Sequence, residues 1–283
     1  MSILDQFSLE GRVAIITGGG TGLGKAICHA FARAGADIVV AGRRLEPIRQ
    51  TESEVKELGR RAISVSTDVT DSGQVDALVE KTIGEYGKVD VLVNNAGIAR
   101  GIEPSQWDSV QIKVGPIWDL SDEKWHRALD VNLGGTFYCC RAVAKHMISQ
   151  QSGKVINMAS VGGLRGAKGW VTYSSAKGGV VMLTKVLAVT WARDNIQVNC
   201  IAPGFIEVVG QAAASQERNM DFIPMGRSGE PKDVGLLAVY LASEASDYVT
   251  GECFILDGSS TVGYAPTGYA PVLDMRTGFE PSE

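Results

Sequence analysis

The stretch VAIITGGGTGLGK, residues 13–25, joins a β-branched apolar run to a cluster of glycines, and a helical pattern continues from it to about residue 34. Glycines allow a sharp turn and a close backbone approach to a pyrophosphate, while a helix N-terminus presents unpaired N–H groups. The stretch therefore predicts a strand, a phosphate-binding turn and a helix. It is not a Walker sequence, because Ala26 stands where Ser or Thr is required. The turn residues expected to bind a cofactor are Gly18, Thr21, Gly22, Leu23 and Gly24.

Strand-like runs alternate with helical patterns along the rest of the chain. Such an alternation is typical of a parallel sheet covered by helices on both faces. We predict a doubly wound (Rossmann) α/β fold with a seven-stranded parallel sheet in a single domain. The expected strands are 13–17, 37–41, 62–66, 89–94, 154–160, 196–202 and 252–256, and the longer expected helices are 72–86, 122–149 and 172–193.

The end of the second expected strand, Ala41-Gly42-Arg43-Arg44, bears on the choice between the two nicotinamide dinucleotides. In dinucleotide-binding folds an acid at this place binds the ribose 2′-OH, whereas an arginine accommodates a 2′-phosphate. Guanidinium groups pair bidentately with phosphate, so Arg43 and Arg44 favour NADP(H). If both arginines only begin a solvated helix, NAD(H) stays possible.

Composition excludes several other classes of function. The chain has 283 residues and a formal net charge of -5, and its basic residues form no block apart from acids, so a nucleic-acid partner is not expected. The longest uncharged stretch, residues 258–273, contains two prolines, so no membrane span is expected either. The opening residues do not resemble a signal peptide, and we expect a cytoplasmic protein.

The cysteines and histidines indicate no metal site. Five cysteines form no CxxC pair and are interpreted as buried free thiols, and three histidines lack metal-ligand spacing. Two long links, 98–120 and 204–230, follow expected strands. Because open α/β sheets bind ligands beyond the carboxyl ends of their strands, these links are candidate binding loops or surface excursions.

Several motifs in order resemble the short-chain dehydrogenase/reductase family: Thr17-Gly18-x-x-x-Gly22-x-Gly24, then Asn94-Asn95-Ala96-Gly97, then Tyr173-x-x-x-Lys177. The resemblance runs from about Leu9 to Gly258, so we expect one NADP(H)-binding domain, 1–258, and a C-terminal extension, 259–283. It implies hydride transfer between a nicotinamide and a carbonyl or secondary alcohol carbon.

The resemblance also implies roles for single residues. The implied catalytic positions are Asn132, Ser160, Tyr173 and Lys177, with a water held by Asn132; the implied cofactor contacts are Asp68, Val69, Asn95, Ala96, Gly97, Tyr173, Lys177, Pro203 and Gly204. One departure concerns Val208, which stands near the place of a threonine that often bonds the carboxamide in such proteins. Valine has no side-chain group for that bond.

The residue types suit this chemistry. Tyr173 and Lys177 are four residues apart and share one helix face, and an ammonium near a phenol favours the phenolate, whose ordinary pKa is about 10. Ser160 at a strand end is placed to donate a hydrogen bond to a substrate oxygen. Trp170 either shapes the substrate side or belongs to the core.

Alternatives to this interpretation remain at this stage. One is a 3-oxoacyl thioester (acyl-carrier-protein) reductase, and another is a non-catalytic NADP(H)-binding sensor or scaffold. The small-molecule substrate itself cannot be read from the sequence. Apolar runs on more than one face of 122–149 and 172–193, together with the resemblance, predict a homotetramer.

Overall fold

Seven parallel strands form one sheet in the order β3-β2-β1-β4-β5-β6-β7. The computed structural model describes residues 2–98, 116–166, 169–207 and 223–262. The order reverses between β1 and β4, which is the switch point at which doubly wound sheets bind ligands. The strands are β1 (Val13–Thr17), β2 (Asp37–Gly42), β3 (Ala62–Ser66), β4 (Val91–Asn94), β5 (Gly153–Met158), β6 (Ile196–Pro203) and β7 (Cys253–Leu256).

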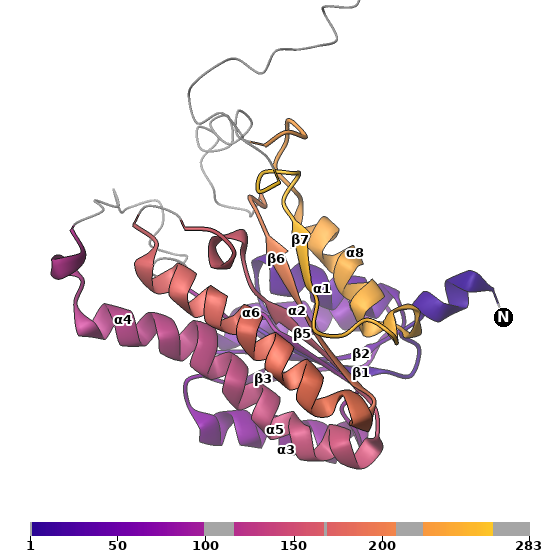
Figure 1. The fold of residues 1–283 in the computed structure, drawn as a ribbon. Coiled ribbons are helices and arrows are strands. Elements are labelled where there is room, and N and C mark those ends of the chain that lie inside the picture. The colour runs from indigo at the N-terminus through magenta and orange to yellow at the C-terminus, as the bar shows by residue number, and fades with distance from the viewer. Residues whose placement is uncertain (1, 99–115, 167–168, 208–222, 263–283) are drawn as a thin grey trace, which may run out of the picture.

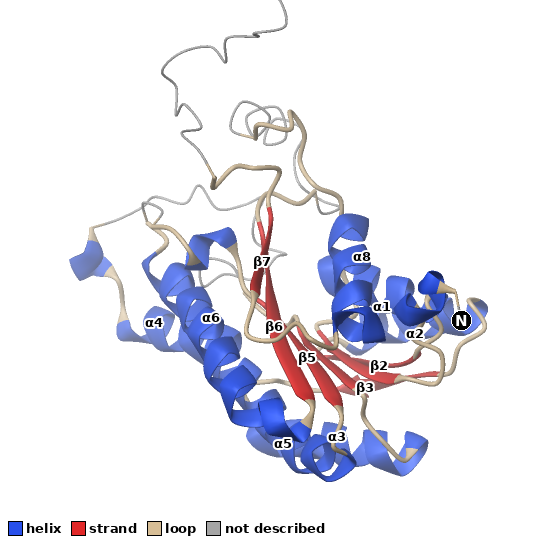
Figure 2. Cartoon of the chain, turned by 45° about the vertical axis from the view of Figure 1, so that its right-hand side comes forward, coloured by secondary structure: helices blue, strands red, loops and turns tan. Residues whose placement is uncertain are grey.

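Helices cover both faces of the sheet, with α1, α2 and α8 on one side and α3, α4, α5 and α6 on the other (Figures 1 and 2). The helices are α1 (Gly22–Arg33), α2 (Leu45–Glu57), α3 (Ser72–Tyr86), α4 (Asp122–Leu129), α5 (Gly135–Gln150), α6 (Val171–Trp191) and α8 (Pro231–Ala242). A π-helical turn, Asp130–Gly134, joins α4 to α5.

The two layers explain why the central strands are buried along their whole length. Successive strand residues point to opposite faces, and in β1 every residue is buried. Ala14 and Ile16 join the hydrophobic cluster under α1 and α8, whereas Ile15 joins the cluster under α3 and α5. A parallel strand buried on both faces therefore has no polar alternation, as the sequence shows.

The predicted α/β fold is confirmed, and the differences from it are local. The fourth strand begins at Val91 rather than residue 89, and just before it the buried Asp90 carboxylate accepts a hydrogen bond of 2.8 Å from the backbone N–H of Val13. The fifth strand ends at Met158, so Ser160 lies beyond it and caps a short 3₁₀ turn, Val161–Gly163. The prediction of one regular helix over 122–149 is wrong, because the π-helical turn interrupts it.

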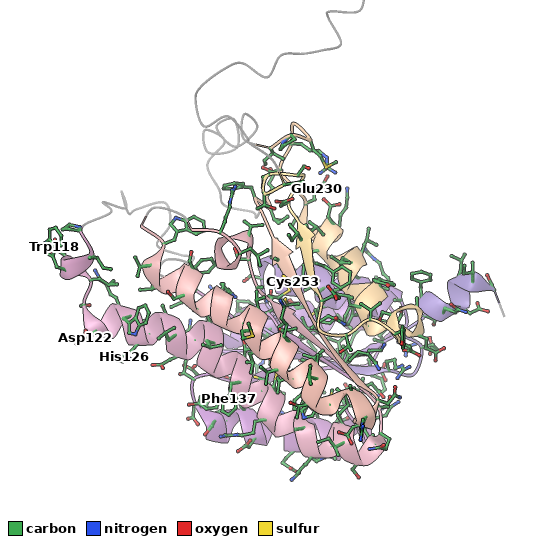
Figure 3. All side chains as sticks on the ribbon, viewed as in Figure 1. Trp118, Asp122, His126, Phe137, Glu230 and Cys253 are labelled. Carbon is green, nitrogen blue, oxygen red and sulfur yellow. The ribbon has the colours of Figure 1, made fainter. Side chains whose placement is uncertain are left out.

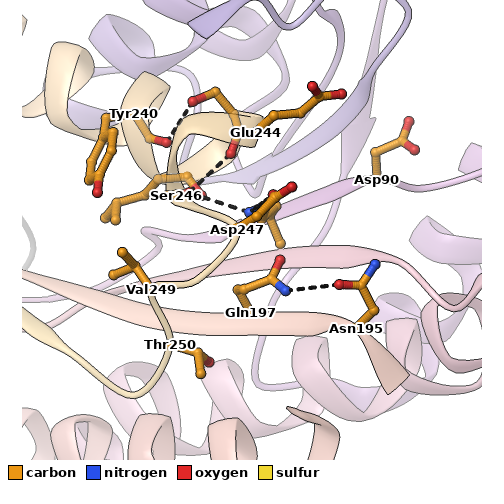
Figure 4. Close-up of polar contacts among 12 residues, drawn as sticks. Asp90, Asn195, Gln197, Tyr240, Glu244, Ser246, Asp247, Val249 and Thr250 are labelled. Carbon is orange, nitrogen blue, oxygen red and sulfur yellow. Dashed lines mark hydrogen bonds and ion pairs between the residues drawn. The ribbon is translucent and has the colours of Figure 1, made fainter. Parts of the chain in front are cut away.

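A polar network lies at the amino end of the sheet, far from the carboxyl ends of the strands. Lys154 at the start of β5 has only 5% of its side chain exposed, and its Nζ lies 2.7 Å from Oδ1 of Asp247 and 3.4 Å from Oγ of Ser246. Ser246 also donates to the carbonyl oxygen of Leu241 in α8. Figure 4 shows Ser246 and Asp247 in this network, beside the hydrogen bond that joins Gln197 to Asn195.

Candidate active site

The glycine turn between β1 and α1 leaves room for a ligand at the helix N-terminus. Gly18 and Gly22 adopt left-handed φ values of 65° and 54°, which side chains rarely tolerate. A Cβ on Gly18 would lie 2.9 Å from Nδ2 of Asn95. Within the described chain, the N-cap residue Thr21 makes no side-chain hydrogen bond to the helix, so the first N–H groups of α1 are left for another partner.

The end of β4 is tied directly to this turn. Asn95 donates from Nδ2 to the carbonyl oxygens of Thr17 (3.0 Å) and Gly18 (3.2 Å). The hydroxyl of Thr17 accepts hydrogen bonds from the backbone N–H groups of Asn95 (3.0 Å) and Ala96 (3.1 Å) and donates to the carbonyl of Val93. The sequence reasoning did not select Thr17 as a site residue, although a hydroxyl in a buried strand was a usable signal.

The ends of β2 and β3 form the outer part of the same edge. Arg43 and Arg44 are exposed directly after β2, and Arg44 is the N-cap residue of α2. Asp68 follows β3, and its Oδ1 accepts hydrogen bonds from the N–H (3.0 Å) and hydroxyl (2.8 Å) of Thr70. Val69 is buried against α5, where a Cβ on Gly135 would come within 2.7 Å of it.

Asn132 lies in the π-helical turn and is fully buried. Its Nδ2 donates to the carbonyl oxygens of Ile98 (2.9 Å) and Ala128 (3.0 Å), and its Oδ1 accepts from the N–H of Ile98 (3.2 Å). The amide therefore fixes the chain just after Gly97 against the helix. Single π turns inside helices are frequent at functional sites, because they re-aim the local backbone.

Lys177 on α6 meets this cluster from the other side. Its Nζ donates a hydrogen bond of 2.6 Å to the carbonyl oxygen of Met158, and a Cβ on Gly97 would lie 3.6 Å from Nζ and 2.7 Å from Oδ1 of Asn132. Only a glycine permits so close an approach of the backbone to Oδ1 of Asn132, whereas the distance to Nζ of Lys177 is an ordinary contact. Burial lowers the pKa of Lys177 to about 8.

Tyr173 and Ser160 complete the arrangement. Nζ of Lys177 lies 5.8 Å from the centre of the Tyr173 ring, on the same face of α6. Burial raises the pKa of the Tyr173 phenol, and a hydrogen bond with Ser160 acts in the opposite direction. The expectation that Lys177 lowers this pKa is therefore wrong for the protein alone: burial dominates, and the lysine's Nζ is bound to Met158.

The rest of the carboxyl end of the sheet is formed by β6, β7 and the segment after Ser160. Gly204 follows Pro203 at the end of β6, and its N–H donates to the carbonyl oxygen of Leu256 (2.9 Å). Arg165 donates from Nη1 to the carbonyl oxygen of Ser260 (2.9 Å). Trp170 packs edge-on against Tyr173 with ring centres 5.6 Å apart, so it lies beside the site rather than in a remote core.

All eighteen described positions singled out from the sequence lie in the segments that follow the strands, at the end of β6, or in α1, the π-helical turn and α6. The structure brings Gly97, Asn132, Ser160, Tyr173 and Lys177 into one cluster beside the glycine turn. Val208 and most of the two long links fall outside the described residues. In the part that is described, no three His, Cys, Asp or Glu side chains are grouped as metal ligands, and no helix is long and apolar enough to cross a membrane.

Comparison with known proteins identifies the class. The family model for short chain dehydrogenases matches residues 12–219, and the chain belongs to this family. It is 40% identical over 262 residues to the 2-dehydro-3-deoxy-D-gluconate 5-dehydrogenase of Dickeya dadantii, covering 90% of this chain and 98% of that one. It is also 35% identical over 254 residues to a 3-oxoacyl-acyl-carrier-protein reductase of Chlamydia muridarum, covering 88% and 97%.

A solved structure of a related enzyme is also similar to this chain. The gluconate 5-dehydrogenase of Burkholderia cenocepacia J2315, in complex with NADP and tartrate, superposes with a TM-score of 0.83 at 35% identity, covering 93% of this chain and 100% of that one. The protein is thus an oxidoreductase of the short-chain dehydrogenase family, acting on CH–OH and C=O groups.

Proposed function

We propose that this protein transfers a hydride between NADP(H) and a carbonyl or secondary alcohol, with Tyr173 as the group that exchanges a proton with the substrate oxygen. The observation that carries the proposal is the cluster of Gly97, Asn132 and Lys177 beside the hydrogen-bonded pair Ser160 and Tyr173. A positioned proton donor next to a second hydroxyl polarises a carbonyl before hydride transfer. The bound nicotinamide supplies the hydride, and the residues below hold it.

The cofactor residues fit a dinucleotide on structural grounds. The left-handed glycines at 18 and 22 and the free first turn of α1 suit a pyrophosphate. Asp68, Val69, Asn95, Ala96 and Gly97 follow the next strands of the same edge and are proposed to contact the adenosine and ribose parts. Pro203 and Gly204 are proposed to begin the wall beside the nicotinamide.

The preference for NADP(H) is proposed on the exposed guanidinium groups after β2. Arg43 and Arg44 stand where a carboxylate would select the unphosphorylated ribose. The related gluconate 5-dehydrogenase was solved with NADP, which supports the same choice. Purified protein is expected to show a lower KM for NADPH than for NADH; a lower KM for NADH would refute this preference.

The proton on Tyr173 is proposed to be exchanged through Lys177. Asn132 positions the loop that carries Gly97, and Lys177 joins α6 to the end of β5 through Met158. A buried ammonium with a pKa of about 8 changes its protonation near neutral pH, as a relay requires. The positive charge of an oxidised nicotinamide would favour the phenolate and so offset the effect of burial.

For the substrate, we propose a small hydroxy acid or oxo acid of the sugar type. Two similar proteins carry gluconate or its derivative in their names, and Arg165 places a guanidinium on the segment after Ser160 that suits a carboxylate. The alternative is a 3-oxoacyl thioester, as in the related reductase. Following NADPH absorbance with a panel of oxo sugar acids and a 3-oxoacyl thioester distinguishes them.

Catalysis is favoured over a sensor or scaffold role, because a binding protein has no need of an acid–base pair. The matched test uses Tyr173→Phe and Ser160→Ala, which should retain NADPH binding by fluorescence while turnover on the best substrate is lost. Wild-type protein that binds NADPH but reduces nothing in a broad ketone, aldehyde and sugar panel would support the sensor instead.

The assembly is proposed to be a homotetramer formed through α5 and α6. Met182, Val186 and Val189 lie on α6 at helical spacing with 59%, 54% and 83% of their surface exposed, and Phe137 on α5 is 43% exposed. Such an apolar stripe is suited to a second copy of the same helices. Light scattering coupled to size exclusion should give four times the chain mass, and a monomer would refute the proposal.

The domain division and the location also remain predictions. Removing residues 263–283, which lie outside the described residues, should leave the cofactor site folded if 1–258 is one domain. Cell fractionation tests the cytoplasmic location.

A further inference from the structure

Two cysteines stand directly opposite each other at the edge of the sheet. Cys200 of β6 is paired in register with Cys253 of β7. Neighbouring strands lie about 4.8 Å apart, which is inside the range of Cα separations that a disulfide spans. Both thiols face α6, because Cys200 and Cys253 pack with Val180 in the same small cluster. A hydrogen bond already joins the two thiols.

The two thiols differ in access and in charge. Cys200 is fully buried, whereas Cys253 on the last strand, labelled in Figure 3, is partly exposed. The hydrogen bond from Cys200 and the positive charge of Lys185 favour the thiolate of Cys253, and they hold its pKa below the ordinary value. The same hydrogen bond, and after it burial, raise the pKa of Cys200 instead. A partly exposed thiolate beside a second thiol is the arrangement of a redox-sensitive pair.

The other cysteines lack these features. Cys28, Cys139 and Cys140 are buried, and burial raises the pKa of all three thiols. Cys28 lies in the cluster on the opposite face of the sheet. Cys139 and Cys140 are adjacent in α5, and Cys140 contacts the amide of Asn94. These three thiols therefore serve as internal controls for reactivity.

We propose that Cys200 and Cys253 form a reversible disulfide when the protein meets a peroxide. The thiolate of Cys253 attacks one peroxide oxygen, the O–O bond breaks, and hydroxide leaves with a proton as water, so that Cys253 becomes a sulfenic acid. The sulfur of Cys200 then attacks Sγ of Cys253; the S–S bond forms, the S–O bond breaks, and the proton of Cys200 leaves with the hydroxide as water. Two electrons pass from the two sulfurs to one peroxide.

The disulfide would join β6 to β7 covalently. The segment between the two cysteines includes the end of β6, the long link after Gly204 and α8, so oxidation would close a loop that contains part of the proposed site edge. Closing such a loop restricts the unfolded chain. We expect the oxidised protein to melt at a higher temperature than the reduced protein, and a thiol reductant should reverse the shift.

The experiment treats full-length protein with hydrogen peroxide under limiting conditions, followed by blocking of free thiols and tryptic mass mapping. The sequence places Cys200 alone in peptide 194–218, Cys253 alone in peptide 233–276, Cys28 in 26–33 and the pair 139–140 in 128–141. The expected result is a cross-link between 194–218 and 233–276 that dithiothreitol removes, with the free-thiol count falling by two from five.

Cysteine variants test which two thiols form the disulfide. Cys253→Ser should abolish both the cross-link and the melting shift, and Cys139→Ser, the matched control, should leave both intact. In Cys200→Ala, the sulfenic acid should accumulate on Cys253 and react with dimedone. If the wild-type protein forms only cross-links between chains, if Cys253 goes directly to the sulfinic acid, or if both peptides stay reduced, the proposal is overturned.

Discussion

Lys177 and Met158 are joined by a hydrogen bond of 2.6 Å from the lysine Nζ to the methionine carbonyl oxygen. Met158 is the last residue of β5, and Lys177 lies one helical turn after Tyr173, so this bond sets the depth of α6 over the carboxyl edge of the sheet. The residue Lys177 as a whole is only 5% exposed. Lys177 therefore positions α6 against β5 and also carries a charge that is shielded from solvent. These two roles can be tested separately.

The first prediction concerns the pH dependence of stability. The folded pKa of Lys177, about 8, lies below the ordinary value of 10.5, so between these values the unfolded chain binds more protons and this lysine makes the folded state more stable as pH rises. Lys177→Met removes that gain. The melting temperature of the variant minus that of the wild type should therefore fall from pH 7 to pH 9.5. Lys81→Met, at an exposed position of α3, is the control. An equal fall in that variant would contradict the assignment of the lowered pKa to Lys177.

The second prediction separates chemistry from binding at Tyr173. Tyr173→Phe keeps the ring that packs against Trp170 but removes the proton, so kcat should drop at least about a hundredfold, the lower range for positioned proton transfer. NADPH affinity, followed by fluorescence, should change little. Tyr240→Phe on α8, whose ring packs on Phe254, serves as the control with unchanged kcat. Substantial residual activity of Tyr173→Phe would remove it as the proton donor.

The sequence predicted the fold closely, because the apolar runs between turn signals are strands, those at the centre of the sheet are buried on two faces, and the glycine turn fixes where the first strand ends. Tyr173, Lys177 and Asn95, which the sequence singled out as site residues, lie at that edge in the structure. It could not predict the π-helical turn at Asn132, since that turn depends on hydrogen bonds to Ile98, thirty-four residues away. Nor could it give the raised pKa of Tyr173, because burial is a property of the packed chain.

The third prediction tests the choice of dinucleotide. Arg43→Ala should raise the KM for NADPH by about tenfold or more and leave the KM for NADH nearly unchanged, because only the former has a 2′-phosphate to pair with a guanidinium. Arg33→Ala, an exposed arginine at the far end of α1, should affect neither. Steady-state kinetics with both cofactors measures the ratio. An equal effect of Arg43→Ala on the two would show that it does not read the 2′ position.

The fourth prediction concerns the glycine turn. Gly18→Ala places a Cβ on a residue with φ of 65° and 2.9 Å from Nδ2 of Asn95, so the turn must shift. The left-handed backbone alone costs about 1–2 kcal/mol, and the shift should add a rise in the cofactor KM. Gly59→Ala has a similar φ of 82° but no atom within 4 Å of the added Cβ. It should lose comparable stability with an unchanged cofactor KM; if both variants bind NADPH like wild type, the turn is not its phosphate site.

The last prediction is that a change at the amino end of the sheet lowers stability without changing activity, because the proposed active site lies at the carboxyl end. Among the described residues, Asp247→Ala leaves the buried ammonium of Lys154 with the hydroxyl of Ser246, 3.4 Å away, as its remaining hydrogen-bond partner, and burial already lowers the pKa of that lysine. Leaving a buried donor short of partners costs about 1–3 kcal/mol, so the melting temperature should fall while kcat stays constant. The double variant Lys154→Met with Asp247→Ala should recover part of the loss, because no charge is then buried unpaired. A double variant less stable than Asp247→Ala would show instead that Lys154 contributes mainly through its contact with Ser246.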